Sequence, residues 1–182
     1  MGKKRNGKNT VKTKLVPSKK ARLTPLQRLL EGDVPFYCGL IILVLIFFVL
    51  YKLLGQNLLS KSDWNTYTLQ AEAWWKGKYW LKENYAHLEL AVFHGKVFVS
   101  FPPVPSVAAF FLIPFFGSKV PDNFLTSMYM VLSFVFAYRF CRNLGKNGWI
   151  SAFWALFLVA GNNIFAHSVN GGVWFQAQSL SF

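Results

Sequence analysis

Four long apolar runs separate the polar parts of this chain, and they cover residues 36–54, 104–116, 124–141 and 149–165. Three of the runs are long enough for a helix that crosses a hydrocarbon layer. The second run is too short, because 13 residues of helix reach only about 20 Å, against a core of about 30 Å. The pattern predicts an all-α polytopic membrane protein with three transmembrane helices.

The short second run carries prolines that fit a helix of its own. Pro105 suits a first helical turn and Pro114 interrupts the end of the run. Apolar runs of this length are more often interfacial or re-entrant than spanning. Residues 104–116 are therefore predicted to form a juxtamembrane helix that lies on the membrane surface or dips into it.

The distribution of basic residues predicts the orientation of the chain. Ten of the twenty Lys and Arg residues fall between Lys3 and Arg28, and a second cluster comprises Arg139, Arg142 and Lys146. Basic segments next to spans tend to remain in the cytoplasm, so an even number of crossings should separate the two clusters. We expect a multi-pass protein of the cell membrane with a cytoplasmic N-terminus and a C-terminus on the outer face.

The basic tail, residues 1–33, accounts for much of the net charge of +13. Such a tail can bind nucleic acid or anionic lipid, but this one runs straight into a membrane segment. We interpret it as a topology signal that also attracts anionic lipid headgroups, at about 1 kcal/mol per basic residue. Membrane lipids are thus expected partners and nucleic acid is not. Residues 34–182 form the predicted membrane domain.

The first outer loop, residues 55–123, contains a predicted amphipathic helix over residues 64–76. Aromatic and small side chains recur at spacings of three and four from Trp64 to Trp74, which places them on one helical face. Asp63 stands where an N-cap residue is expected, and Gly77 follows as a C-terminal signal. Tryptophan-rich helices of this kind are typical of a membrane interface.

A short β-hairpin is predicted between the two juxtamembrane helices. The stretch LELAVFHGKVFVSF alternates around His94-Gly95. Glycine readily adopts the positive φ that a two-residue hairpin turn requires. The sequence FPP at residues 101–103 then leads into the second juxtamembrane helix.

The order of these elements resembles the N-terminal part of bacterial GT-C-type membrane glycosyltransferases. The resemblance includes the protein-mannosyltransferase-like and aminoarabinose-transferase-like group, and it covers about residues 34–180. It rests first on a span followed by an outer loop that opens with an acidic residue on an aromatic helix. It rests also on the hairpin that leads to FPPVPSVAAFFLIPFFG, and on the two later spans, which end in YRFCRNLG and GNNIFAHSVNGGVW. Members have more spans than this chain, whose sequence stops at QAQSLSF in mid-pattern, so we expect a piece of a longer protein.

The resemblance implies sugar transfer from a polyprenyl-phosphate-linked donor to an acceptor on the outer face. The family's acidic residue in the first outer loop, which acts as the catalytic base or orients the acceptor, corresponds to Asp63 in this chain. The family often has Asp-Glu here, whereas this chain has Asp63-Trp64, and the stretch HSVNGGVWFQAQ lacks the second acidic residue that parts of the family carry. The cofactor therefore stays unknown, and the sequence gives no support for a divalent metal.

Other polar and aromatic residues predicted to face the same side are candidates for a sugar or acceptor pocket, with one ring able to stack on a sugar. They are His87, His167, Asn170, Trp174 and Gln176.

Two other functions stay open. The chain could be a non-catalytic multi-span scaffold or subunit, in which Asp63 would only cap a helix, a role worth about 1 kcal/mol. A transporter fragment is disfavoured because no predicted span contains an Asp or Glu.

Overall fold

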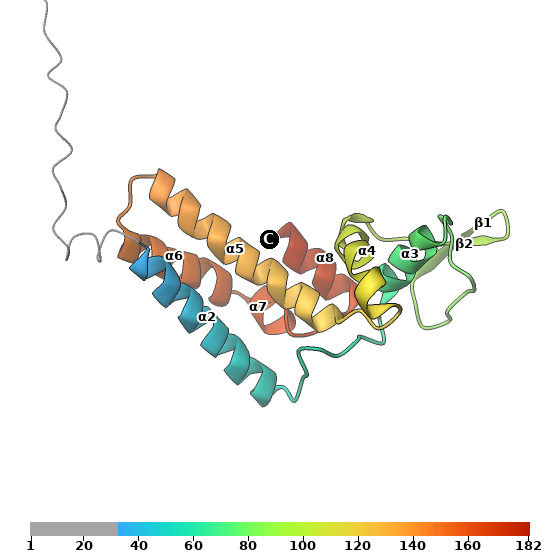
Figure 1. Cartoon of the computed structure of the whole chain (residues 1–182), viewed down its shortest axis with the longest axis horizontal. Helices are drawn as coiled ribbons and strands as arrows, with labels where there is room; N and C mark the ends of the chain where they lie inside the picture. Colours follow the sequence, from blue (N-terminus) through green and yellow to red (C-terminus); the bar gives the residue numbers. More distant parts are fainter. Residues whose placement is uncertain (1–32) are drawn as a thin grey trace, which may run out of the picture.

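Three helices form a bundle in the computed structural model, which describes residues 33–182; the predicted tail, residues 1–33, thus falls almost wholly outside the described residues. The bundle helices are α2 (Val34–Leu53), α5 (Asp122–Asn143) and α6 (Gly148–Ala160). Figure 1 shows them side by side, with α6 packed against both of the others.

Two of these helices, α2 and α5, are long enough and apolar enough to cross a membrane. The predicted third span, residues 149–165, is not one continuous helix. Its first part is α6, which has 13 residues and thus a length of about 20 Å. The chain then bends at Gly161, and α7 (Asn163–His167) begins after it with Asn162 as its N-cap. The structure therefore confirms two candidate spans and leaves the third a prediction.

The bundle core is built from large side chains that meet small ones. Leu43, Phe134, Ala155 and Val159 are buried in one cluster that joins all three helices. A Cβ atom on Gly39 would lie 2.7 Å from the Phe134 ring, so glycine is needed where α2 approaches α5. Removing a buried phenylalanine side chain from such a core typically costs about 3–5 kcal/mol.

The start of α2 and the turn between α5 and α6 lie at the same end of the bundle, which we call the turn end. A Cβ on Gly148 would be 2.8 Å from the Pro35 side chain. At the opposite end, the loop end, the rings of Phe47 and Phe165 have centroids 4.6 Å apart. Helix α2 thus runs from the turn end to the loop end, α5 runs back to the turn end, and α6 runs again toward the loop end.

The loop between α2 and α5 builds a separate layer beside the loop end (Figure 1). This loop layer, residues 55–121, contains α3 (Thr66–Trp75) and α4 (Val104–Phe116), which pack against each other. The Trp75 indole N–H donates a 2.6 Å hydrogen bond to the carbonyl of Phe110. The predicted bounds of the second juxtamembrane helix are confirmed, and this helix does not join the bundle side by side with α2.

The predicted hairpin is also confirmed. Strands β1 (Leu90–Phe93) and β2 (Lys96–Val99) pair antiparallel. The two turn residues have positive φ angles, 47° at His94 and 71° at Gly95. Positive φ at both positions is the signature of a type I′ turn, whose twist matches that of the flanking strands.

The predicted start of the first juxtamembrane helix is wrong. Helix α3 begins at Thr66 with Asn65 as N-cap, so Asp63 lies two residues before the cap. Other hydrogen bonds hold the residues before α3. The Trp64 amide donates to the Ser62 hydroxyl, and the Trp64 carbonyl accepts from the Val173 amide. Past the other end of α3, Gly77 adopts the expected positive φ of 68°.

The last helix, α8 (Val173–Ser181), starts at the loop end and runs back along α5. Its far end reaches well along the bundle, since Phe182 shares a surface cavity with Phe136 and Phe140 of α5. The prediction places all of residues 166–182 on the side of the first outer loop. Residues 166–172 lie near the loop layer, whereas the chain after them turns back toward the middle of the bundle.

Candidate functional site

An open recess of about 750 Å³ lies against α3 in the loop layer. Its walls come from the segment before α3, from α3 itself, from the segment before the hairpin and from the turn after α4. Most of the residues that line it have polar or charged side chains; the lining comprises Lys61, Asp63, Trp64, Asn65, Leu69, Glu72, Tyr85, His87 and Ser118. The predicted residues Asp63 and His87 therefore belong to one site.

The Asp63 side chain is exposed in this recess and unengaged. Within residues 33–182, no hydrogen bond or ion pair holds its carboxylate. The other acidic residue of the lining, Glu72, is paired with Lys76 at 2.6 Å. Because Asp63 is not the cap of α3, the structure assigns it no local structural role, and its oxygens are open to an incoming hydroxyl group.

Aromatic rings form one side of this region. The Trp64 ring lies 5.9 Å from His87 and 5.2 Å from Trp174, measured between ring centroids, and Phe101 lies 6.3 Å from Trp174. Two of the predicted binding residues thus meet at Trp64, directly after Asp63 in the chain. Tryptophan faces offer large apolar areas beside polar edges, which suits a sugar ring.

A second carboxylate, that of Asp122, is fully buried where α5 begins. It accepts hydrogen bonds from the Ser62 amide at 3.0 Å, the Thr68 hydroxyl at 2.8 Å and the Gln176 side-chain amide at 3.2 Å. All three donors are neutral groups. Hydrogen bonds to charged groups contribute about 1.5–3 kcal/mol each, so Asp122 ties together the loop layer, α5 and α8.

The neighbouring residue extends this connection. The Asn123 side-chain amide donates 2.8 Å hydrogen bonds to the carbonyl of Asn57 and the hydroxyl of Ser60, and its oxygen accepts from the Gly171 amide at 2.6 Å. A Cβ on Gly171 would lie 2.3 Å from the Asp122 backbone. We call Asp122 and Asn123, with the groups that bond them, the clasp.

Sequence reasoning missed the clasp. The stretch GSKVPDN gives one local signal, an acidic residue in the first turn of a helix, where it favours the positive end of the helix dipole. The sequence gives no sign that Ser62, Thr68 and Gln176 converge on that residue.

Four predicted binding residues lie outside the recess; one of them, Trp174, packs on Trp64 of its lining. Gln176 is buried in the clasp, where it also donates a 2.8 Å hydrogen bond to the Gly171 carbonyl. The Asn170 side chain accepts from the Gly172 amide at 2.9 Å. The His167 ring stacks on Phe175 with centroids 4.8 Å apart. Gln176 and Asn170 thus hold the backbone, and His167 packs on α8.

Two tyrosines near the site are kept in the protonated form. Burial raises the pKa of Tyr67 to about 12. Burial also raises the pKa of Tyr85, helped by a hydrogen bond and negative charge from Glu83 and by the charge of Glu72. Both hydroxyls therefore keep their protons near neutral pH, and that of Tyr67 is buried with no hydrogen-bond partner among the described residues.

The recess does not assemble a metal site from the described residues. Asp63, Glu72 and His87 line the same recess, but no three His, Cys, Asp or Glu side chains within residues 33–182 converge on a metal position.

Comparison with known proteins finds no matching family model, no matching curated protein and no matching solved structure. The resemblance to GT-C-type enzymes therefore rests on the residues quoted above, and the geometry of the site is the evidence that bears on function.

Proposed function

We propose that this chain is part of a membrane glycosyltransferase that moves a sugar from a polyprenyl-phosphate donor to an acceptor on the outer face of the membrane. The observation that carries the proposal is the recess in which the unengaged Asp63 carboxylate stands beside the ring of Trp64, which packs on Trp174. A free carboxylate beside aromatic faces suits a site where a sugar meets a hydroxyl acceptor.

In this proposal, α2 and α5 cross the membrane, α6 with α7 supplies the third crossing, and the turn end faces the cytoplasm. The loop layer then lies at the outer surface, where its tryptophans suit the interface. Arg142 lies in the last turn of α5 and Lys146 follows the helix at the turn end, as cytoplasmic basic residues should. Helix α8 leads from the outer surface back into the bilayer along α5.

The proposed chemistry needs one proton transfer. Asp63 accepts the proton of the acceptor hydroxyl while the hydroxyl oxygen attacks the anomeric carbon of the donor sugar. The bond between that carbon and the lipid phosphate breaks, and the phosphate leaves with the electron pair. Trp64 and Trp174 hold the sugar ring, and His87 lines the same recess as Asp63.

The test is sugar transfer by purified, full-length protein in detergent, with a polyprenyl-phosphate-linked sugar as donor. Asp63→Asn should lower the transfer rate by about 10²- to 10⁴-fold, the usual cost of losing a general base. Folding should be unchanged, because no hydrogen bond from residues 33–182 holds the Asp63 carboxylate. Glu89→Gln removes an equally exposed carboxylate outside the recess and should leave the rate unchanged. Near-normal transfer by Asp63→Asn would remove Asp63 from the mechanism.

A non-catalytic scaffold or subunit is the second candidate. The observation that favours it is the clasp, because the most extensively bonded carboxylate of the described chain, Asp122, is buried and used to join helices. Under this hypothesis the Asp63→Asn protein would behave like the unaltered protein in every assay.

A further inference from the structure

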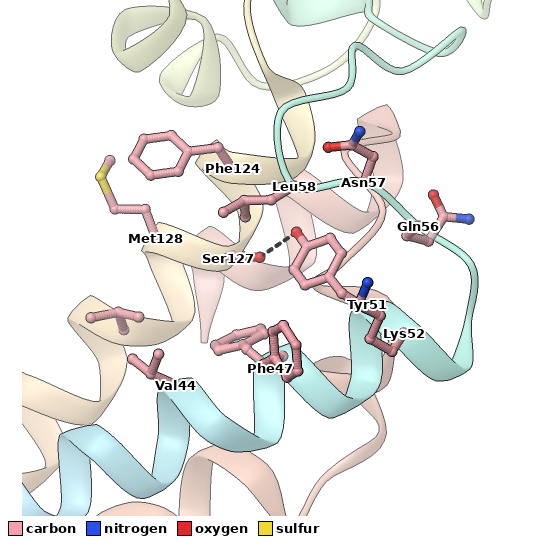
Figure 2. Close-up of a pocket in the computed structure, with 12 residues that line it drawn as sticks. Val44, Phe47, Tyr51, Lys52, Gln56, Asn57, Leu58, Phe124, Ser127 and Met128 are labelled. Carbon is pink, nitrogen blue, oxygen red and sulfur yellow. Dashed lines mark hydrogen bonds between the residues drawn. The ribbon is translucent and has the colours of Figure 1, made fainter.

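A groove of about 660 Å³ opens between α2 and α5 near the loop end. Figure 2 shows the residues that line it. Its length is lined by apolar side chains, among them Val44, Phe47 and Met128, and one end carries Lys52, Gln56 and Asn57. The groove thus has an apolar channel and a polar mouth, and it is separate from the recess at Asp63.

The floor of the groove has no unsatisfied polar group where Tyr51 enters it. The Tyr51 hydroxyl lies 2.8 Å from that of Ser127 and donates to the Asn123 carbonyl at 3.2 Å (Figure 2). Because these hydroxyls bond each other, an occupant meets a surface that is effectively apolar. A hydrocarbon chain is the occupant that such a channel suits best.

The mouth carries a positive charge. The Lys52 ammonium group forms no ion pair with the described residues and lies 5.7 Å from the centroid of the Phe48 ring. The lining contains no acidic residue. Gln56 and the side-chain nitrogen of Asn57 supply neutral amide donors beside this charge. Phosphate oxygens match both kinds of donor.

The dimensions of the groove fit one leaflet of a bilayer. Lys52 and Val44 are eight residues apart on α2, a distance of about 12 Å along the helix axis. Half of a hydrocarbon core is about 15 Å thick. A headgroup at Lys52 would therefore leave its acyl chain to lie along the groove as far as the middle of the bilayer.

We infer that this groove binds one anionic glycerophospholipid, with its phosphate at Lys52, Gln56 and Asn57 and one acyl chain between α2 and α5. The inference rests on the membrane placement given under Proposed function, but it does not depend on catalysis. It places a lipid site at the opposite end of α2 from the basic tail.

The test measures lipid binding by native mass spectrometry on the purified full chain in detergent. The probes are phosphatidylglycerol and phosphatidylcholine with identical acyl chains. Lys52→Gln removes the charge at the mouth, and Val44→Trp fills the channel. Two matched controls are available: Lys119→Gln removes an exposed lysine outside the groove, and Val49→Trp enlarges a valine of α2 that is outside it and, like Val44, 53% exposed.

We expect one phosphatidylglycerol per chain, bound in preference to phosphatidylcholine. Lys52→Gln should weaken phosphatidylglycerol binding about fivefold, the effect of one basic residue at an anionic surface, and should leave phosphatidylcholine binding unchanged. Val44→Trp should abolish the binding of both lipids, and both controls should bind as the unaltered chain does.

Other occupants would give other results. Equal phosphatidylglycerol binding by Lys52→Gln, Val44→Trp and the controls would overturn the site. Displacement of the bound lipid by an equimolar amount of polyprenyl monophosphate would also overturn the site. The same holds if the chain forms a dimer in place of a lipid adduct and Val44→Trp dissociates that dimer. Alkaline carbonate tests the membrane placement separately. If it extracts the chain from membranes, both the membrane placement and the lipid site are overturned. If the chain stays in the membrane, a failure of the lipid experiments concerns the lipid site alone.

Discussion

The hydroxyl of Thr68 on α3 donates a 2.8 Å hydrogen bond to the buried carboxylate of Asp122, the first residue of α5. Two residues earlier on the same helix, the hydroxyl of Thr66 is buried with no partner among the described residues. Both threonines are fully buried. The pair therefore separates the effect of the hydrogen bond from the effect of burial.

Thr68→Val should lower the free energy of unfolding by about 1.5–3 kcal/mol, since it removes a donor to a buried charge. Thr66→Val should be neutral or stabilising, because it replaces an unsatisfied hydroxyl by a methyl group of similar size. Denaturant titration in detergent, followed by tryptophan fluorescence, measures both. Equal effects of the two substitutions would mean that the clasp contributes no more than packing.

Gly171→Ala should destabilise the protein strongly. Its new Cβ would lie 2.3 Å from the Asp122 backbone and 2.6 Å from the Asn123 amide nitrogen, so the clasp must open; overpacking typically costs about 1–3 kcal/mol. Gly172→Ala is the matched control, because the atoms nearest its Cβ would be side-chain atoms of Asn170 at 3.2 Å, Phe175 at 3.4 Å and Trp64 at 3.7 Å. Thermal unfolding of the two variants should show a clearly lower Tm for Gly171→Ala.

Cysteine labelling in intact cells tests the proposed orientation. Cys38 and Cys141 are first replaced by serine, and single cysteines are placed at Ser118 and Asn143, which are both exposed in the structure. A membrane-impermeant maleimide should label position 118 from outside and should reach position 143 only after the cells are opened. Labelling of position 143 in intact cells contradicts the orientation.

His94→Asn should stabilise the hairpin, because His94 has a φ of 47° and asparagine tolerates this left-handed region better than most residues. The gain should be at most about 1 kcal/mol, in keeping with the cost of that conformation. Gly95→Ala, at a φ of 71°, should have the opposite effect. Hydrogen exchange of the amides in residues 90–99 reports both changes, and faster exchange in His94→Asn would count against the type I′ turn.

Local signals in the sequence were sufficient for some elements and insufficient for others. The bounds of α4 follow from Pro105 and the apolar run, and the hairpin follows from His94-Gly95, because each depends on its own residues. The end of α6 was missed because residues 149–165 were taken as one run, although Gly161 and Asn162 end α6 and begin α7 within it.

The candidate site, too, could be predicted from the sequence only in part. Asp63 and His87 could be assigned to one side of the molecule from the order of the elements, and they line one recess. The N-cap assignment of Asp63 is wrong because a distant residue, Val173, holds the backbone of Trp64 and delays the helix. Asp122 was missed because its donors come from positions 54 to 60 residues away.

The clasp also sets an order of assembly during synthesis. Asp122 and its donors Ser62 and Thr68 leave the ribosome before Gln176 and the Gly171 backbone that complete the clasp. Until that later segment emerges, the Asp122 carboxylate lacks one of its three donors and Asn123 lacks the Gly171 amide. The loop layer and α5 therefore gain their full set of connecting hydrogen bonds only after residues 171–176 have been synthesised.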